Sequence, residues 1–223
     1  MDPNERRYEF VMVNDSEDAR LFIELSSHAV DLVEARDALA LALQSTAVTE
    51  SPLQGAERSL IANAAMAYCR TFFPSKVRRP ITSLVQIPAR VFATHDLVAM
   101  FRNRTIAHSQ SDLSVTYAVG VLDADTLEVV DVSAPNLSST MPPEQVKNFI
   151  ELVDAVMAEL DQVIEPVRMR LAARLAVTDR VSLRDVGLSP TTRMLPAEQF
   201  GSQRTRSPYP TSHPMYTRTG PSH

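Results

Sequence analysis

One short stretch of the sequence, residues 101–109, gathers side chains that bind phosphate and transfer protons. It reads Phe-Arg-Asn-Arg-Thr-Ile-Ala-His-Ser, which brings Arg102, Arg104 and His108 close together along the chain. An arginine guanidinium is permanently charged and forms paired hydrogen bonds with phosphate oxygens. Histidine is the side chain that gives or takes a proton near neutral pH. These are the groups that cleavage of a phosphodiester without a metal ion requires.

Helices are predicted to position this stretch. Apolar residues recur at three- and four-residue steps behind the acidic cap Asp15–Asp18, which predicts a first helix over about Ser16–Gln44. Ser51 is the expected N-cap of a second helix, which extends to about Phe73. A third helix runs from Ala89 or Thr94 to Ala107 and carries residues 101–107 of the stretch.

A fourth helix is predicted to open at Pro142-Pro143-Glu144, and its apolar residues fit a heptad spacing. These residues are Val146, Phe149, Val153, Val156, Leu160, Val163 and Val167. Such a stripe is more often intramolecular core than a dimer seam. Pro166 is expected to kink the helix, which then resumes to about Leu175.

The remaining segments complete the predicted architecture. Between the third and fourth helices the apolar period changes to two, which predicts a β-hairpin over about residues 114–132. After Gly187, Ser, Thr, Pro and Arg dominate, so residues 177–223 are expected to form a disordered tail. The fold class is therefore mainly α. We expect an N-terminal extension at residues 1–15, an antiparallel four-helix bundle with the inserted hairpin at residues 16–176, and the tail.

Composition limits the class of protein. Apolar residues make up 44% and charged residues 22% of the chain, as in ordinary globular proteins. No apolar run is long enough to cross a bilayer, and the first residues do not resemble a signal peptide. We therefore expect a cytoplasmic protein without a membrane association. Cys69 is the only cysteine, which excludes an intramolecular disulfide. No spacing of ligands predicts a metal site, and no cofactor is expected.

Charge is unevenly distributed along the chain. The net charge is −5, but residues 167–223 hold nine Arg against three acids, a net +6 that leaves −11 for the preceding residues. An acidic body with a basic tail suggests that the tail binds something anionic, such as a second copy of the body. A tail that only improves solubility is an equally good interpretation.

The stretch Arg102–Ser109, at the end of a third helix, resembles the R-(N/D)-x-x-I-A-H-S motif of the abortive-infection branch of the HEPN superfamily. Residues Tyr68–Phe73, followed by Arg78, are similar to the second-helix signature of these defence and toxin proteins. The resemblance covers about Ser16–Leu175. It implies a HEPN-like bundle, a homodimer in which the Arg and His of both protomers meet in one cleft, and a metal-independent endoribonuclease activity.

Position-by-position matching with this motif makes Arg102 and His108 the catalytic pair and Asn103 the polar residue after the arginine. The chemistry is consistent with these residue types. RNA supplies its own nucleophile, the 2′-hydroxyl, which His108 can activate as a general base or whose leaving group it can protonate. An arginine stabilises the charge that develops on the phosphoryl oxygens. The expected products are a 2′,3′-cyclic phosphate and a 5′-hydroxyl.

The spacing of the pair leaves three arrangements open. Residues six apart in a regular helix do not share a face, whereas Arg104 and His108, four apart, do. The helix loosens before His108, or Arg102 acts across a dimer interface, or Arg104 is the closer partner. Arg104, Ser109 and Arg70 are expected to support phosphate binding, although a salt bridge is the simpler role for Arg70.

Other functions compete with ribonuclease activity. His108 can simply interact with the carbonyl groups at a helix C-terminus, where Arg102 and Arg104 would also be favourable surface cations. The chain would then be a non-catalytic HEPN-like binding or dimerisation module. A third hypothesis is a toxin whose motif is covered by an antitoxin or another defence-system partner. RNA remains the expected substrate of the first hypothesis.

Overall fold

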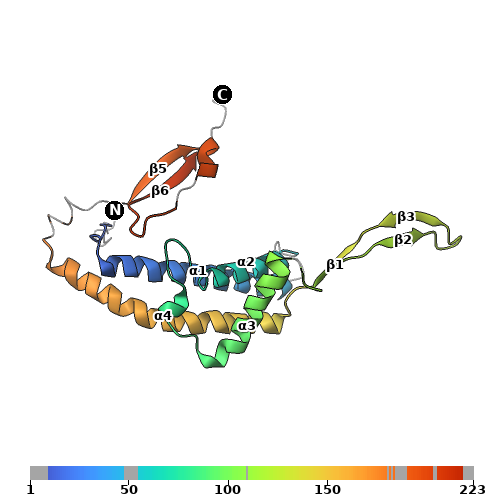
Figure 1. The fold of residues 1–223 in the computed structure, drawn as a ribbon, viewed down its shortest axis with the longest axis horizontal. Helices are drawn as coiled ribbons and strands as arrows, with labels where there is room; N and C mark the ends of the chain where they lie inside the picture. The colour runs from blue at the N-terminus through green and yellow to red at the C-terminus, as the bar shows by residue number, and fades with distance from the viewer. Residues whose placement is uncertain are drawn as a thin grey trace, which may run out of the picture. The chain divides into compact units, whose positions relative to one another are not determined.

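The computed structural model describes residues 10–47, 55–108, 110–179, 190–202 and 205–217, with Val181 and Leu183. Over these residues the chain is mainly helical with small two-stranded sheets (Figure 1), which confirms the predicted mainly α class. It divides into two compact units. The central unit holds His28–Phe73 and Ile81–Leu160, and the terminal unit holds Met1–Ser27, Pro74–Pro80 and Asp161–His223. Helices α1 (Glu17–Ala47) and α4 (Pro143–Val177) extend through both units.

The first helix begins as its sequence predicts. The Ser16 Oγ accepts a hydrogen bond from the Ala19 backbone N–H at 3.2 Å, and the Ser16 carbonyl accepts one from the Arg20 N–H at 2.9 Å. This is N-capping, which satisfies donors that the first turn cannot pair internally. The predicted end at Gln44 is close to the observed end at Ala47.

Within the central unit, α1 lies antiparallel to α2 (Glu57–Arg70). Glu34 on α1 accepts a hydrogen bond from Asn63, while Asp31, one turn earlier, pairs with Arg70, seven residues later on α2. The predicted start of this helix at Ser51 lies outside the described residues. Its C-terminal end is earlier than predicted, since Thr71 caps the helix by donating its hydroxyl to the Tyr68 carbonyl at 2.7 Å.

The core of the central unit is formed by apolar side chains from all four helices. Those that are fully buried include Leu32, Leu39, Ile61, Ala64, Tyr68, Val98, Phe149, Leu152, Val153 and Val156. The heptad stripe predicted for the fourth helix is therefore largely intramolecular core. Alanines at positions 64, 65 and 67 of α2 leave little side-chain volume, which allows close approach of the neighbouring helices.

Helix α3 (Phe92–Phe101) is attached to α2 by a partly buried polar contact. The Tyr68 hydroxyl lies 2.9 Å from the His95 Nδ1. The Tyr68 ring also packs edge-on against His95 and Phe149, with ring centroids 5.9 Å and 5.4 Å away, and against Phe72 at 4.8 Å. Burial raises the pKa of the Tyr68 phenol and lowers that of His95. Both groups are thus neutral partners in one aromatic cluster.

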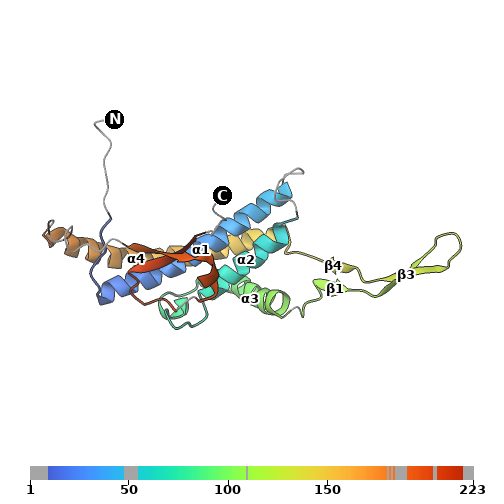
Figure 2. The ribbon, with the colours of Figure 1, turned by 90° about the horizontal axis from the view of Figure 1, so that it is seen from above.

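The predicted hairpin is present as a ribbon of two short antiparallel pairs. Strands β1 (Ser114–Thr116) and β4 (Asn136–Ser138) pair at its base, and β2 (Val119–Leu122) and β3 (Val129–Ser133) pair further out (Figures 1 and 2). The Asp123 carboxylate accepts backbone hydrogen bonds from Asp125 and Thr126 and closes the turn. Every residue of β2 and β3 is exposed. The ribbon therefore adds nothing to the core.

The fourth helix continues through its internal proline. It runs from Pro143 to Val177 with Pro166 inside, so helix extends slightly past the predicted end at Leu175. In the terminal unit, its basic second half pairs with the start of α1: Asp18 binds Arg170 at 2.8 Å and Arg174 at 3.0 Å. These arginines lower the pKa of Asp18, chiefly through the hydrogen bond from Arg170.

The prediction of a disordered tail is wrong for part of the tail's length. Strands β5 (Thr191–Pro196) and β6 (Ser212–Thr217) pair in parallel, with the 3₁₀ segment η4 (Ala197–Ser202) between them. Phe200 packs edge-on against Tyr216 at 5.2 Å. The Tyr209 hydroxyl also donates to the Val13 carbonyl. Low apolar content led to the prediction of disorder, but backbone pairing and these two aromatic side chains provide local structure.

Stability should fall on mild acidification because of His95. Its pKa is lowered from 6.5 by burial, so the unfolded chain binds the proton more readily than the folded one. The associated stability is present above about pH 6.5 and is lost as the pH falls toward the lowered folded-state pKa. Thermal unfolding from pH 7.5 to 5 should show this loss, and His95→Gln should reduce it. An unchanged pH dependence in the variant would contradict this linkage.

Removal of the outer ribbon should leave the helical core intact. Thr116 pairs directly with Asn136, so residues 117–135 can be replaced by Asn-Gly, which favours a two-residue hairpin turn. The melting temperature should change by less than about 3 °C, the shift expected for about 1 kcal/mol in a chain of this size. Leu39→Ala, which removes a fully buried side chain, is the comparison and should cost about 2–5 kcal/mol.

Candidate functional site

The motif lies where α3 changes its helical geometry. Beyond Phe101 the chain forms a π-helical turn, η3 (Arg102–Ala107), and His108 then leaves helical geometry with φ −122° and ψ −2°. A π-helical turn forms backbone bonds between residues five apart instead of four, and such turns are frequent at functional sites. The loosening before His108, one of the arrangements that the sequence left open, is therefore observed.

Arg102 is half-buried and is held by neutral groups. Its Nη1 donates to the Asn103 Oδ1 at 2.8 Å, and its Cζ lies 5.0 Å from the centroid of the Phe73 ring. The Arg102 Nε is buried without a hydrogen-bond partner among the described residues. A cation over an aromatic ring is attracted without being neutralised. No carboxylate therefore neutralises Arg102 among the described residues.

The polar motif residues that follow Arg102 directly, and the histidine, are open to solvent. Asn103, Arg104 and His108 are exposed, and Ser109 lies outside the described residues. The Arg104 carbonyl accepts the Gln110 N–H at 2.7 Å, which ties the turn to the chain that follows. Among the described residues, none of Arg102, Arg104 and His108 forms an ion pair. Their positive or titratable groups are therefore available to an anionic ligand.

The widened turn changes which residues can meet His108. A π-helical turn joins residues five apart, and Asn103 is five residues before His108. Arg104 is four residues before His108 and Arg102 is six, so Arg104 is the closer of the two arginines along the chain. Within the described part of the chain no hydrogen bond or ion pair joins Arg102 to His108. The structure brings Arg102 and Asn103 together and shows no direct contact between Arg102 and His108 among the described residues.

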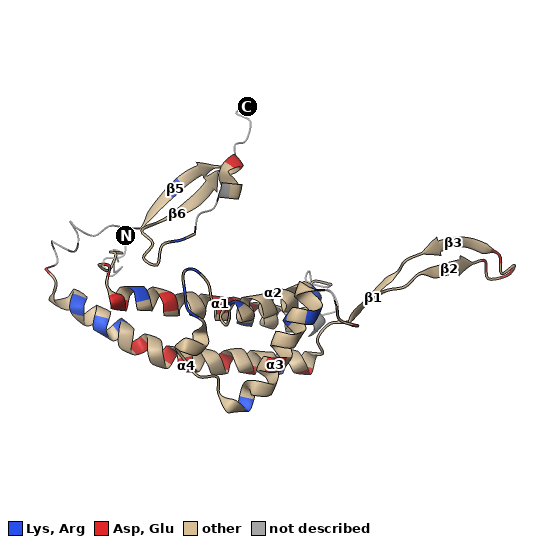
Figure 3. Ribbon diagram, in the orientation of Figure 1, with Lys and Arg blue, Asp and Glu red and all other residues tan. Residues whose placement is uncertain are grey.

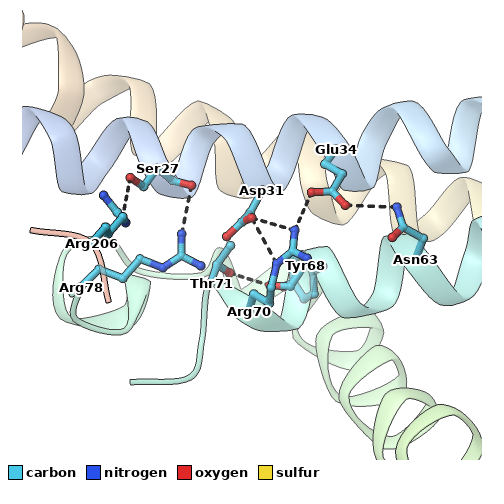
Figure 4. Close-up of polar contacts among 9 residues, drawn as sticks. All are labelled: Ser27, Asp31, Glu34, Asn63, Tyr68, Arg70, Thr71, Arg78 and Arg206. Carbon is cyan, nitrogen blue, oxygen red and sulfur yellow. Dashed lines mark hydrogen bonds and ion pairs between the residues drawn. The ribbon is translucent and has the colours of Figure 1, made fainter. Parts of the chain in front are cut away.

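Arg70 pairs with two carboxylates of α1 and is not placed as a free phosphate ligand. Its Nη2 lies 2.8 Å from an Asp31 oxygen and 2.5 Å from a Glu34 oxygen, as Figure 4 shows. Asp31 is 11% exposed and Arg70 44% exposed. The salt bridge that sequence reasoning held as the simpler role is present. Arg70 therefore supports the site indirectly, by joining α1 to the end of α2.

Sequence reasoning gave no role to Phe73, which shapes the surroundings of Arg102. Phe73 supplies the aromatic face, although only its membership of the Tyr68–Phe73 segment was noted. Cys69 is also buried, and burial raises the pKa of its thiol to about 11, while the Arg102 charge acts in the opposite direction. The sequence did offer one signal for this contact: Phe73 is an aromatic residue at the end of a predicted helix, and an arginine-rich segment lies elsewhere in the chain.

In the terminal unit a further pair of arginines converges on one residue. Arg78 Nη1 donates to the Ser27 carbonyl and Arg206 Nη2 donates to the Ser27 Oγ, both at 3.0 Å (Figure 4). Arg79 pairs with Glu24 at 2.7 Å. The basic connector after α2 thus binds the first helix, and one tail arginine binds there too.

The described residues contain no group of three or more His, Cys, Asp or Glu side chains that could hold a metal ion. Among the same residues, no helix combines the length and apolar character needed to cross a membrane. Comparisons with protein-family models, with curated proteins and with solved structures find no match to this chain. The assignment of function therefore depends on the residues and their geometry.

Loss of the Arg70 side chain should destabilise the fold more than loss of a surface arginine. Arg70→Ala leaves the largely buried Asp31 carboxylate without this cation, which should cost about 1–3 kcal/mol. Arg36→Ala is the matched control, because Arg36 and Asp154 are each 48% exposed and such pairs contribute about 0–1 kcal/mol. Urea unfolding measures both. Equal losses would show that the burial of Asp31 does not matter.

Proposed function

We propose that this chain is a metal-independent endoribonuclease of the defence or toxin type, with Arg102 and His108 as its catalytic pair. The observation that supports it is that the arginines of the turn at Arg102–His108 pair with no carboxylate in the described structure. Elsewhere arginines such as Arg36, Arg70, Arg79 and Arg170 pair with carboxylates. In the described structure, Arg102 and Arg104 lack such carboxylate partners although the protein is acidic overall.

The proposed reaction needs one proton acceptor, one proton donor and a charge stabiliser. The RNA 2′-hydroxyl loses its proton to a base and attacks the adjacent phosphorus, so that a 2′,3′-cyclic phosphate forms. The 5′-oxygen leaves with its electron pair and receives a proton. His108 performs one of these transfers as an exposed imidazole at the turn. Arg102, whose guanidinium pairs with no carboxylate among the described residues, stabilises the phosphoryl oxygens.

The separation of Arg102 and His108 supports a composite site in a homodimer. Arg102 bonds Asn103 and no direct contact joins it to His108 in the described structure, so the arginine of one copy and the histidine of another are proposed to act on one phosphate. The same arrangement is the one that the resemblance to HEPN dimers implies.

A non-catalytic binding or dimerisation module is the second candidate. The contact of Arg102 with Phe73 and its hydrogen bond to Asn103 favour this alternative, because both can serve only to fix the end of α3. The net charge of −5 also disfavours broad contact with RNA. A toxin that is controlled by an antitoxin would use the same motif, with the partner covering it.

Cleavage should persist in EDTA and depend on the motif. With tRNA, rRNA and mRNA as substrates, His108→Ala should lower the rate by about 100- to 10,000-fold, the usual contribution of a general acid or base. Arg102→Ala should also lower it strongly. The controls are His213→Ala and Arg90→Ala, which remove exposed side chains of the same types elsewhere. Undiminished cleavage by the His108 variant would contradict the proposed chemistry.

Complementation between two inactive variants tests the composite site. Co-expressed Arg102→Ala and His108→Ala chains form heterodimers in which one site keeps an intact His108 and the partner subunit's Arg102. Part of the wild-type activity should then return, whereas each variant alone stays inactive. Failure to recover activity in proven heterodimers would show that both groups act from one protomer. Complete loss on Arg104→Ala, with Arg102→Ala active, would transfer the role to Arg104.

A further inference from the structure

A pocket of about 310 Å³ opens beside the motif within the central unit. Leu97, Met100 and Phe101 of α3 contribute to its apolar lining, together with Leu113 and Met141. Pockets that hold small organic groups begin at about this size and combine an apolar lining with few polar groups. The surface is thus suited to a flat, partly apolar group.

The polar groups of the pocket are placed where they can identify such a group. The Thr140 Oγ1 is buried and has no hydrogen-bond partner among the described residues. Asp112 contributes an exposed carboxylate, and Arg104 and Thr105 extend from η3. A buried hydroxyl without a partner costs about 1–3 kcal/mol, a cost that a bound ligand removes. Thr140 is therefore a natural recognition group.

Backbone contacts hold these groups in place. The Ser139 N–H donates to the Leu113 carbonyl at 2.8 Å, which joins the two segments that frame the pocket. The Gln110 N–H donates to the Arg104 carbonyl at 2.7 Å and joins the following segment to η3. Preformed positions of this kind reduce the ordering cost of binding.

We infer that this pocket binds an unpaired RNA base that carries an exocyclic amino group, at the nucleotide next to the phosphate bound by the motif. The inference rests on the proposed function, since Arg104 belongs to both the pocket and the motif. An unpaired base stacks on apolar and aromatic side chains such as Phe101 and is identified by hydrogen bonds at its edge.

The charge of the pocket selects among the bases. The Asp112 carboxylate accepts hydrogen bonds from the amino groups of adenine, cytosine or guanine. Uracil has no amino group, and its one Watson–Crick donor, N3–H, is flanked by two carbonyl oxygens that a carboxylate repels. The Thr140 hydroxyl both donates and accepts, so it can pair with a ring nitrogen or a carbonyl of the bound base. Arg104 at the η3 side is placed to bind the phosphate of the same nucleotide.

Binding of uncleavable RNA separates this inference from catalysis. Fluorescent hexamers of 2′-O-methyl adenosine, cytidine and uridine lack the nucleophile, and fluorescence anisotropy measures their affinity for the full chain. The adenosine and cytidine hexamers should bind roughly ten-fold more tightly than the uridine hexamer, the discrimination expected from one good base contact. Equal affinity for all three, or no binding of any, would overturn the inference.

Variants locate the preference in the pocket. Asp112→Asn should bring the three affinities within about two-fold of one another, because it removes the carboxylate charge. Thr140→Val keeps the side-chain shape and should weaken the adenosine hexamer by about ten-fold. Thr116→Val, at the exposed last residue of β1, is the control and should leave all three affinities unchanged. If both pocket variants kept the wild-type order of affinities for the three hexamers, the base would be recognised elsewhere.

The two hypotheses fail in different ways. Base preference that depends on Asp112 and Thr140, without cleavage of any RNA, would retain the pocket and reject the nuclease. Cleavage that depends on His108, with no base preference, would retain the nuclease and reject the pocket.

Discussion

Burial of the Tyr68 hydroxyl is the constraint on which the arrangement around the motif depends. A fully buried phenol requires a hydrogen-bond partner, and the His95 Nδ1 at 2.9 Å provides one from another helix. The contact is directional, whereas apolar packing alone leaves a helix freer to rotate or slide. It therefore fixes how α3 sits on α2 within the central unit. Phe72 packs against both rings, and Phe149 packs against Tyr68.

The position of the motif follows from this attachment. His95 and Arg102 are on the same helical segment, two turns apart, so the direction of α3 also determines where η3 begins. Phe73, just after α2, then meets the Arg102 guanidinium. One charge is thereby kept close to a buried cluster without a carboxylate to neutralise it. Figure 3 shows the contrast with the ribbon, where acidic residues gather near the turn and residues 105–146 include no Lys or Arg.

Sequence patterns predicted the parts of this fold that follow from local chemistry. Ser16 caps α1, the apolar stripe of α4 is buried, and the period-two segment forms the ribbon, because each depends on neighbouring residues along the chain. The Tyr68–His95 contact and the place of Phe73 could not be predicted, since both join residues far apart in sequence. Strands β5 and β6 were missed for the same reason: their partner strand is distant, and their composition resembles that of disordered chains. The motif itself was located by residue type, but its π-helical geometry has no simple sequence signal.

The π-helical turn separates the local geometry of the motif from the stability of the fold. None of the residues of η3 is buried, and the helix is already anchored upstream through His95 and Val98. A turn of this kind accommodates one residue more than an α-helical turn of the same rise. The fold consequently tolerates a change in the number of residues between Arg102 and His108. A single-residue deletion there can convert η3 to α-helix and turn the imidazole to another side, while the core packing of the four helices stays the same.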